Sequence, residues 1–172
     1  DFEESDYFRH YMGLLNSERL NQILEKYDLE VNFYLHAKFQ EYADTFKSIS
    51  KRIHLISFGE VAVNEMLMRC RMLITDYSSV CWDILYQDKP SLFYQFDIEK
   101  YNEAHGSYID METELFGDRA ATQEQLLDYL EETVQNDFRL KPEYEKMRGE
   151  YLQFKDHEHS RHICEEIKKR FH

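Results

Sequence analysis

Glycine and proline are scarce in this sequence, with five and two among its 172 residues. Because these residues are the strongest local breakers of helices and strands, their scarcity predicts regular elements joined by short turns. No stretch approaches the roughly 20 apolar residues that a membrane-spanning helix needs. The chain also has neither a starting methionine nor a signal peptide. We therefore expect it to be a fragment of a longer protein.

Basic residues are in deficit, because 21 lysines and arginines stand against 34 acidic residues, a formal net charge of −13. A chain this acidic has no general electrostatic attraction for nucleic acid or for an anionic bilayer. We therefore expect no nucleic-acid partner. A phosphorylated ligand would have to be held locally, by backbone amides, helix N-termini and a few hydroxyl or basic side chains.

Cysteine is also rare, and Cys70, Cys81 and Cys164 show no CxxC spacing. An odd number without that spacing favours three reduced, partly buried thiols in a cytosolic protein. Cys81 follows Ser79 closely, but the sequence pairs it with no histidine, which argues against a thiol nucleophile.

Aromatic side chains are abundant, with 13 tyrosines, 12 phenylalanines and one tryptophan, and 42% of all residues are apolar. Disordered chains lack this capacity for burial. The length and composition therefore predict one folded domain with a substantial core. Within residues 1–172 we predict an α/β core over 1–135 and C-terminal helices over 136–172.

Segments with the patterns of strands and helices alternate along the predicted core. The predicted strands span residues 29–35, 53–58, 71–75 and 91–96. Helical patterns cover residues 6–15, 17–27, 39–46, 63–70 and 79–85, and from Thr122 onward the chain is predicted to be helical. Such alternation indicates a parallel sheet with helices on both faces.

Three predicted strand ends carry polar residues, namely His36, Asp76 and the corner Gln95-Phe96-Asp97. Ligands of parallel α/β sheets bind at the carboxyl ends of the strands. If these strands are parallel, all three ends lie along one edge of the sheet. The sequence therefore predicts a polar cluster at that edge.

The run from Ile74 to Val80 is the most informative segment, because a strand ends there and Ser78 and Ser79 immediately open a helix. Free N–H groups at a helix N-terminus favour a phosphate, and serine hydroxyls add donors. Asp83, one turn later, is placed to accept hydrogen bonds from ribose hydroxyls or a glycerol. The alternative is that a serine only caps the helix while Asp76 holds a turn.

Three histidines near the C-terminus, His157, His159 and His162, could suggest a metal. On a helix only His159 and His162 share a face, and a zinc site usually needs a third well-placed ligand. The spacing therefore favours a solvated helix start, and we predict neither a metal nor a cofactor.

The run Leu73–Val80 (LITDYSSV), followed by Asp83 and by Lys89-Pro90, resembles the C-terminal signature of the CDP-glycerol glycerophosphotransferase family. Family members carry Leu-His-Pro where this chain has Leu35-His36-Ala37. The resemblance continues through Phe93–Asp97 and Gly106–Asp110, and it extends from about Val31 to Thr133.

The resemblance implies a GT-B-type transferase with two Rossmann-like lobes, of which this chain is the C-terminal, nucleotide-binding lobe. The implied donor is CDP-glycerol or a related CDP-polyol, and the implied acceptor is a lipid-linked wall or capsule polymer. The full enzyme would then work as a peripheral protein at the cytoplasmic face of the bacterial membrane. Its residues that bind the donor would be Leu35, His36, Ala37, Asp76, Ser78, Ser79 and Asp83.

His36 is the implied catalytic residue, because it would neutralise charge on the departing CMP as the acceptor attacks the glycerol-bearing phosphorus. The family's second catalytic histidine belongs to a Trp-His-Gly-Thr type segment of the N-terminal lobe. That segment is absent from these residues, so the fragment alone should be inactive. Ala37 in place of the family's proline loosens the turn after His36.

Two alternative functions remain open at this point. One is a non-catalytic α/β module for nucleotide binding or regulation that has kept the fold and lost the chemistry. The other is a lobe of a GT-B glycosyltransferase that uses another nucleotide donor.

Overall fold

The computed structural model describes residues 2–35, 37–106 and 109–171. In chain order its elements are the 3₁₀ helix η1 (Phe2–Glu4), α1 (Asp6–Leu15), α2 (Glu18–Lys26), β1 (Val31–Tyr34), the 3₁₀ helix η2 (Ala37–Thr45), β2 (Ile53–Ile56), α3 (Val63–Arg69), β3 (Leu73–Thr75), α4 (Val80–Tyr86), β4 (Ser91–Tyr94), α5 (Ile98–Ala104), β5 (Asp118–Ala120), α6 (Gln123–Gln135), α7 (Pro142–Tyr151) and α8 (His159–Phe171).

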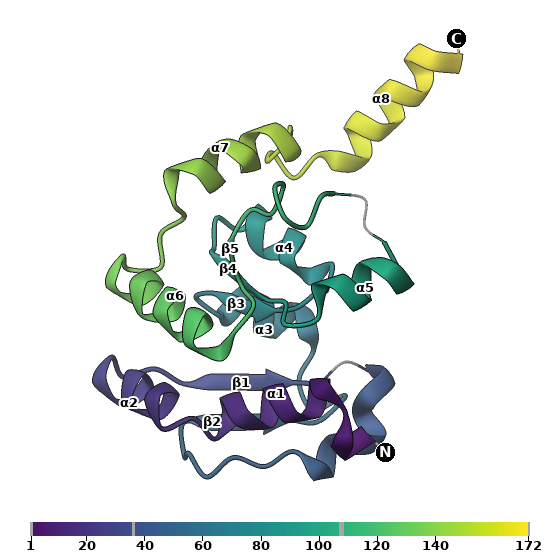
Figure 1. Ribbon diagram of the computed structural model, residues 1–172. Helices are drawn as coiled ribbons and strands as arrows, with labels where there is room; N and C mark the ends of the chain where they lie inside the picture. Colours follow the sequence, from purple (N-terminus) through teal and green to yellow (C-terminus); the bar gives the residue numbers. More distant parts are fainter. Residues whose placement is uncertain (1, 36, 107–108, 172) are drawn as a thin grey trace.

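All the described strand pairs are parallel (Figure 1). One sheet pairs β1 with β2, and a second sheet has the order β3-β4-β5. Helices cover both faces, because α1 and α6 share a core with one side of β4 while α4 packs against the other side. The predicted fold class is confirmed, with the difference that the described strands form two sheets.

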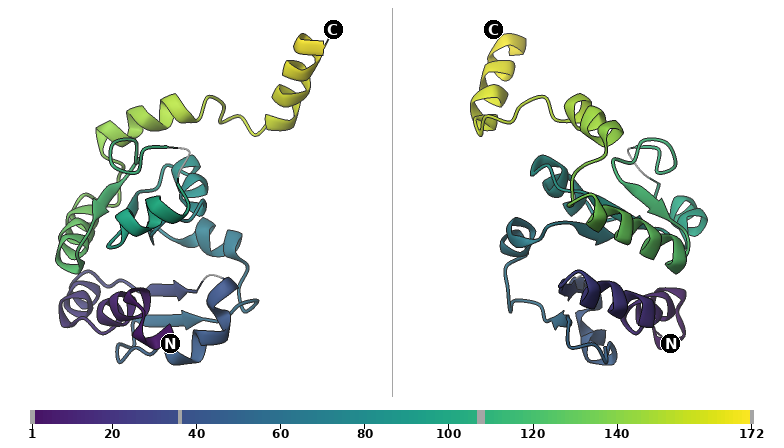
Figure 2. Two further views of the ribbon diagram at one scale, coloured as in Figure 1. Left: turned by 45° about the vertical axis from the view of Figure 1, so that its right-hand side comes forward. Right: turned by 90° about the vertical axis from the view of Figure 1, so that its left-hand side faces the viewer.

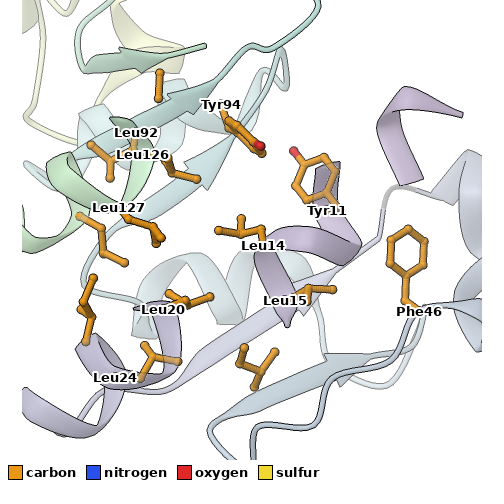
Figure 3. Close-up of a cluster of buried hydrophobic side chains, with 14 of the residues drawn as sticks. Tyr11, Leu14, Leu15, Leu20, Leu24, Phe46, Leu92, Tyr94, Leu126 and Leu127 are labelled. Carbon is orange, nitrogen blue, oxygen red and sulfur yellow. The ribbon is translucent and has the colours of Figure 1, made fainter. Parts of the chain in front are cut away.

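The larger core lies between the helices α1, α2 and α6 and the strands (Figure 3). Leu14 of α1, Leu24 of α2 and Leu126 of α6 meet Leu92 and Tyr94 of β4 in this cluster. All of them are buried. Burial of leucine-sized side chains contributes about 1.5–3 kcal/mol each, so this cluster holds the two sheets together.

The second core lies on the opposite face of β4 and contains Cys81, Leu85, Phe93, Phe116 and Leu140. Helix α7 packs against it through partly buried aromatic and methionine side chains. Helix α8 has no buried residue and projects from the rest of the molecule (Figure 2).

Gly117 permits the close approach of β5 to β4. A Cβ atom at this position would lie 2.1 Å from the backbone oxygen of Ser91 and 2.9 Å from the ring of Phe93. Both neighbours are buried, so a larger residue would force β5 away from its partner strand.

The predicted helix start at Thr122 is confirmed. Thr122 Oγ1 accepts from the N–H of Gln125 at 3.3 Å, and Gln125 Oε1 accepts from the N–H of Thr122 at 3.2 Å. This reciprocal pair is a capping box, which satisfies two donors that a helix start would otherwise leave free. Pro142 occupies the first turn of α7, where its missing N–H costs nothing.

Several details differ from the expectations. Residues 37–45 form a 3₁₀ helix, and α5 and β5 were not predicted. Cys81 is buried and Cys70 is half-buried, but Cys164 is exposed, so the expectation of partial burial is wrong for that thiol. Within the described ranges, no helix is both long enough and apolar enough to span a membrane.

Candidate functional site

The carboxyl ends of β3 and β4 lie side by side, because the two strands are parallel and in register from Leu73 and Ser91. Asp76 and Gln95 follow these strands directly. The side-chain Nε2 of Gln95 donates to the backbone oxygen of Asp76 at 3.1 Å. Two of the three predicted strand ends therefore meet at one edge of the sheet.

Tyr77 joins this edge to the start of α5. Its hydroxyl donates to Oδ1 of Asp97 at 2.8 Å, and its ring stacks on Tyr101 with centroids 3.6 Å apart. Its backbone N–H donates to Oδ1 of Asp76 at 2.7 Å. Burial and the hydrogen bond to Asp97 raise the pKa of Tyr77 well above its usual value, so the hydroxyl remains a donor.

The start of α4 carries the serine pair. Ser79 is the N-cap residue, yet no side-chain hydrogen bond caps this helix within the described part of the chain. Ser78 is half-buried, and Ser79 and Asp83 are exposed. The simple N-cap alternative is therefore not supported, because neither hydroxyl holds the helix start as Thr122 does.

Leu35 follows β1 and is only 3% exposed. Its backbone oxygen accepts from Nε2 of Gln40 at 2.5 Å. Oε1 of the same amide accepts from the N–H of Phe58 at 3.0 Å, which ties the end of β1 to the segment after β2. Ala37 opens η2. His36 lies outside the described residues, so its predicted place in the cluster stays a prediction.

Helix α1 brings two tyrosines to the same edge. Burial raises the pKa of Tyr7 and of Tyr11 well above the usual value, and the negative charges of Asp76 and Asp97 add to the effect. Both hydroxyls therefore remain protonated at neutral pH. We did not predict this contribution, because α1 is far from β3 in sequence and its pattern shows only an amphipathic helix.

A hollow of about 350 Å³ opens where β4 and β5 end and α6 begins. Its lining comes from Arg9, His10, Tyr94, Ala121, Thr122 and Gln123. Arg9 is paired with Oδ1 of Asp6 at 2.7 Å, and the ring of His10 stacks on Phe96 at 3.9 Å. No local sequence signal indicates this hollow, because only the folded sheet brings α1 and α6 together.

The C-terminal histidines contact α4 and the segment that precedes α8. Nε2 of His159 lies 3.1 Å from the hydroxyl of Tyr86, and Nε2 of His162 lies 2.8 Å from Oδ2 of Asp156. Among the residues that the structure describes, no group of three or more metal-binding side chains is present.

Comparison with known proteins shows the family of this chain. The family model described as CDP-Glycerol:Poly(glycerophosphate) glycerophosphotransferase matches residues 3–169. The chain is 27% identical over 157 residues to the minor teichoic acid biosynthesis protein GgaB of Bacillus subtilis, covering 90% of this chain and 17% of that protein. It is also 27% identical over 146 residues to the teichoic acid glycerol-phosphate transferase of Staphylococcus aureus, covering 82% of this chain and 34% of that protein.

The fold is shared with a solved structure of the wall teichoic acid polymerase TagF, with a TM-score of 0.65 and 21% identity. That match covers 92% of this chain and 39% of the solved one. The chain thus spans a minor part of the length of the proteins that it matches. Because the family model covers nearly every residue, the chain belongs to the CDP-glycerol:poly(glycerophosphate) glycerophosphotransferase family.

Proposed function

We propose that this chain is the nucleotide-binding lobe of a CDP-glycerol-dependent glycerophosphotransferase that extends a wall or capsule polymer. The observation that carries the proposal is the turn between β3 and α4 in a chain of this family. There, two serine hydroxyls stand at the carboxyl edge of a parallel sheet without capping the helix that they open. A ligand-binding role gives these hydroxyls the partners that the helix does not supply.

The turn offers distinct contacts to the donor. Ser78 and Ser79 donate to phosphate oxygens, where a charged acceptor makes each hydrogen bond stronger than a neutral one. Asp83, exposed one turn later on α4, accepts from hydroxyl groups of the ribose or the glycerol. Asp76 takes the N–H of Tyr77 and fixes the turn from which the serines project.

In the proposed reaction, His36, which stands between Leu35 and Ala37 in the sequence, lies beside the pyrophosphate of the donor. The acceptor hydroxyl attacks the glycerol-bearing phosphorus, the bond to the CMP oxygen breaks, and His36 stabilises the charge that develops on CMP. Support for this role comes from the position of Leu35 at the end of β1 and from the family membership.

The whole enzyme is proposed to need more than residues 1–172. These residues supply a single lobe, with the α/β core over 1–135 and the C-terminal helices over 136–172. An N-terminal lobe of the same polypeptide supplies the second catalytic histidine. The acceptor is lipid-linked, and the enzyme works as a peripheral protein on the inner face of the cell membrane.

Titration calorimetry of the full-length polypeptide with CDP, UDP and ADP tests the proposed donor. We expect CDP to bind at least tenfold more tightly than the other two nucleotides. The Ser78→Ala variant should lose about 10- to 100-fold in CDP affinity, since a hydrogen bond to a charged group contributes about 1.5–3 kcal/mol.

Ser160→Ala is the matched control, because Ser160 is exposed on α8, away from the turn, and its loss should leave CDP affinity unchanged. Equal affinity for all three nucleotides would favour a lobe that uses another donor. No CDP binding by the folded protein would favour a module without this chemistry.

A further inference from the structure

The side chain of Asp97 does not cap the helix that it precedes. Asp97 is the N-cap residue of α5, yet no side-chain hydrogen bond caps this helix within the described part of the chain. An aspartate at this position usually accepts from a backbone N–H two or three residues later. Oδ1 of Asp97 instead accepts from the hydroxyl of Tyr77 at 2.8 Å. The carboxylate therefore holds a residue that lies 20 positions earlier in the sequence, next to the serine pair.

One face of α5 contacts Tyr77. Asp97, Tyr101 and His105 follow one another at intervals of four residues, so they lie on the same side of the helix. The N–H of Tyr101 donates to the backbone oxygen of Asp97 at 3.0 Å, which fixes this spacing. The ring of Tyr101 stacks on that of Tyr77, with centroids 3.6 Å apart and planes 5° apart. The ring of His105 extends the stack, 5.0 Å from Tyr101.

The contacts with Tyr77 matter for the position of α5, because this helix has no buried residue of its own. Lys100 of α5 also pairs with Oδ2 of Asp6 at 2.7 Å, but both of these side chains are exposed. Exposed ion pairs contribute little to stability, whereas the hydrogen bond from Tyr77 to Asp97 is partly buried. Tyr77 and Asp97 therefore form the firmer link between α5 and the edge of the sheet.

Tyr77 directly precedes the serine pair, so its position determines where Ser78 and Ser79 lie. Its N–H donates to Oδ1 of Asp76 at 2.7 Å. The backbone oxygen of Ser78 accepts from the N–H of Cys81 at 3.3 Å, at the start of α4. Because no side-chain hydrogen bond caps α4 at Ser79, the turn depends on the contacts of the tyrosine.

We propose that Asp97 is a positioning residue of the donor site, which acts through the hydroxyl of Tyr77 to hold the turn that carries Ser78 and Ser79. This inference rests on the proposed function, because it takes the serine pair as the group that binds the donor. A carboxylate repels phosphate, so Asp97 serves the site through the tyrosine rather than by contact with the donor's phosphates. Burial and the bond to Asp97 raise the pKa of Tyr77 well above its usual value, so its hydroxyl remains a donor.

Two tyrosine variants of the full-length polypeptide separate positioning from general stability. Tyr77→Phe removes the bond to Asp97. The control Tyr144→Phe removes a similar bond, from the hydroxyl of Tyr144 to Oδ1 of Asp118 at 2.9 Å, at the amino end of β5. In calorimetric titration, CDP affinity should fall about tenfold in Tyr77→Phe and stay unchanged in Tyr144→Phe. Parental affinity in Tyr77→Phe would overturn the proposal.

Variants of Asp97 distinguish positioning from direct contact between Tyr77 and the donor. Asp97→Asn keeps an oxygen that accepts from the Tyr77 hydroxyl, so CDP affinity should stay within about threefold of the parent. Asp97→Ala should lower the affinity about tenfold, and combining it with Tyr77→Phe should weaken binding no further. Weak binding by Tyr77→Phe together with normal binding by Asp97→Ala would show that the tyrosine contacts the donor itself. That result would overturn the role of Asp97.

Amide hydrogen exchange without nucleotide tests the same role independently of the donor. The N–H groups of Tyr77 and Cys81 should exchange at least tenfold faster in Asp97→Ala than in the parent, and at the parental rate in Asp97→Asn. The N–H of Leu126, bonded to the oxygen of Thr122 at 3.1 Å, is the internal control and should not change.

Unchanged exchange at Tyr77 in Asp97→Ala would overturn the positioning role, whatever the protein binds. A parent protein that binds no CDP would instead contradict the proposed function. The exchange rates would still decide whether Asp97 holds the turn.

Discussion

Gln95 is the residue that most directly supports the turn before the serine pair. It is fully buried, and its Nε2 donates to the backbone oxygen of Asp76. Its Oε1 has no hydrogen-bond partner among the described residues. A buried unpartnered oxygen costs about 1–3 kcal/mol, so the amide is not optimal for stability. This cost suggests that Gln95 serves to position the turn rather than to stabilise the fold.

Replacement of Gln95 by leucine separates these two roles. Gln95→Leu removes the unpartnered oxygen together with the bond to Asp76, so we expect a melting temperature equal to or above that of the parent protein. Affinity for CDP should nevertheless fall about tenfold, since the turn that carries Ser78 and Ser79 loses its support. A thermal melt of the full-length polypeptide measures the melting temperature, and a calorimetric titration measures its affinity for CDP. A large fall in melting temperature with normal affinity would show that Gln95 is only structural.

At the scale of single elements, the starts of α4 and α6 are a matched pair. Thr122 accepts a hydrogen bond at the start of α6, whereas no side chain caps α4 at Ser79. Thr122→Ala should therefore cost about 1 kcal/mol of unfolding free energy. Ser79→Ala should change it by less than about 0.5 kcal/mol. Urea denaturation measures both, and equal losses would mean that the Ser79 hydroxyl does cap its helix.

The strands and helix starts that could be predicted carry strong local signals. The apolar runs of β1 and β4 and the cap at Thr122 are visible in the sequence alone. In contrast, β5 is only Asp118-Arg119-Ala120, and its extended form depends on pairing with β4. That pairing is possible because Gly117 lets the chains approach, a tertiary effect that no periodicity indicates.

At the scale of the whole molecule, the candidate site combines segments that are far apart in the chain. The ends of β3 and β4 could be predicted to meet, because parallel strands place their carboxyl ends at one edge. The contributions of α1 could not be predicted, since the charge of Asp76 influences the pKa of Tyr7 and of Tyr11 only after α1 docks on the sheet. The division of the described strands into two sheets likewise becomes visible only in the folded arrangement.

The isolated lobe and the full-length polypeptide should differ in activity, because the proposed active site needs both lobes. In the proposed reaction, catalysis needs groups from both lobes held around one phosphorus, and this positioning is lost when half of the groups are missing. Residues 1–172 alone should therefore show no turnover of CDP-glycerol. The full-length polypeptide should be active, and His36 should matter mainly for the step in which charge develops on CMP.

The most direct measurement is transfer of glycerol phosphate from CDP-glycerol to a lipid-linked acceptor by the full-length polypeptide and its His36→Ala variant. His54→Ala is the control, because His54 is exposed on β2. We predict one CMP released for each glycerol phosphate transferred. The His36→Ala variant should lose about 100-fold or more in kcat with little change in KM and in melting temperature, whereas His54→Ala should keep normal turnover. No transfer by the parent enzyme, or normal turnover by a folded His36→Ala variant, would contradict the account.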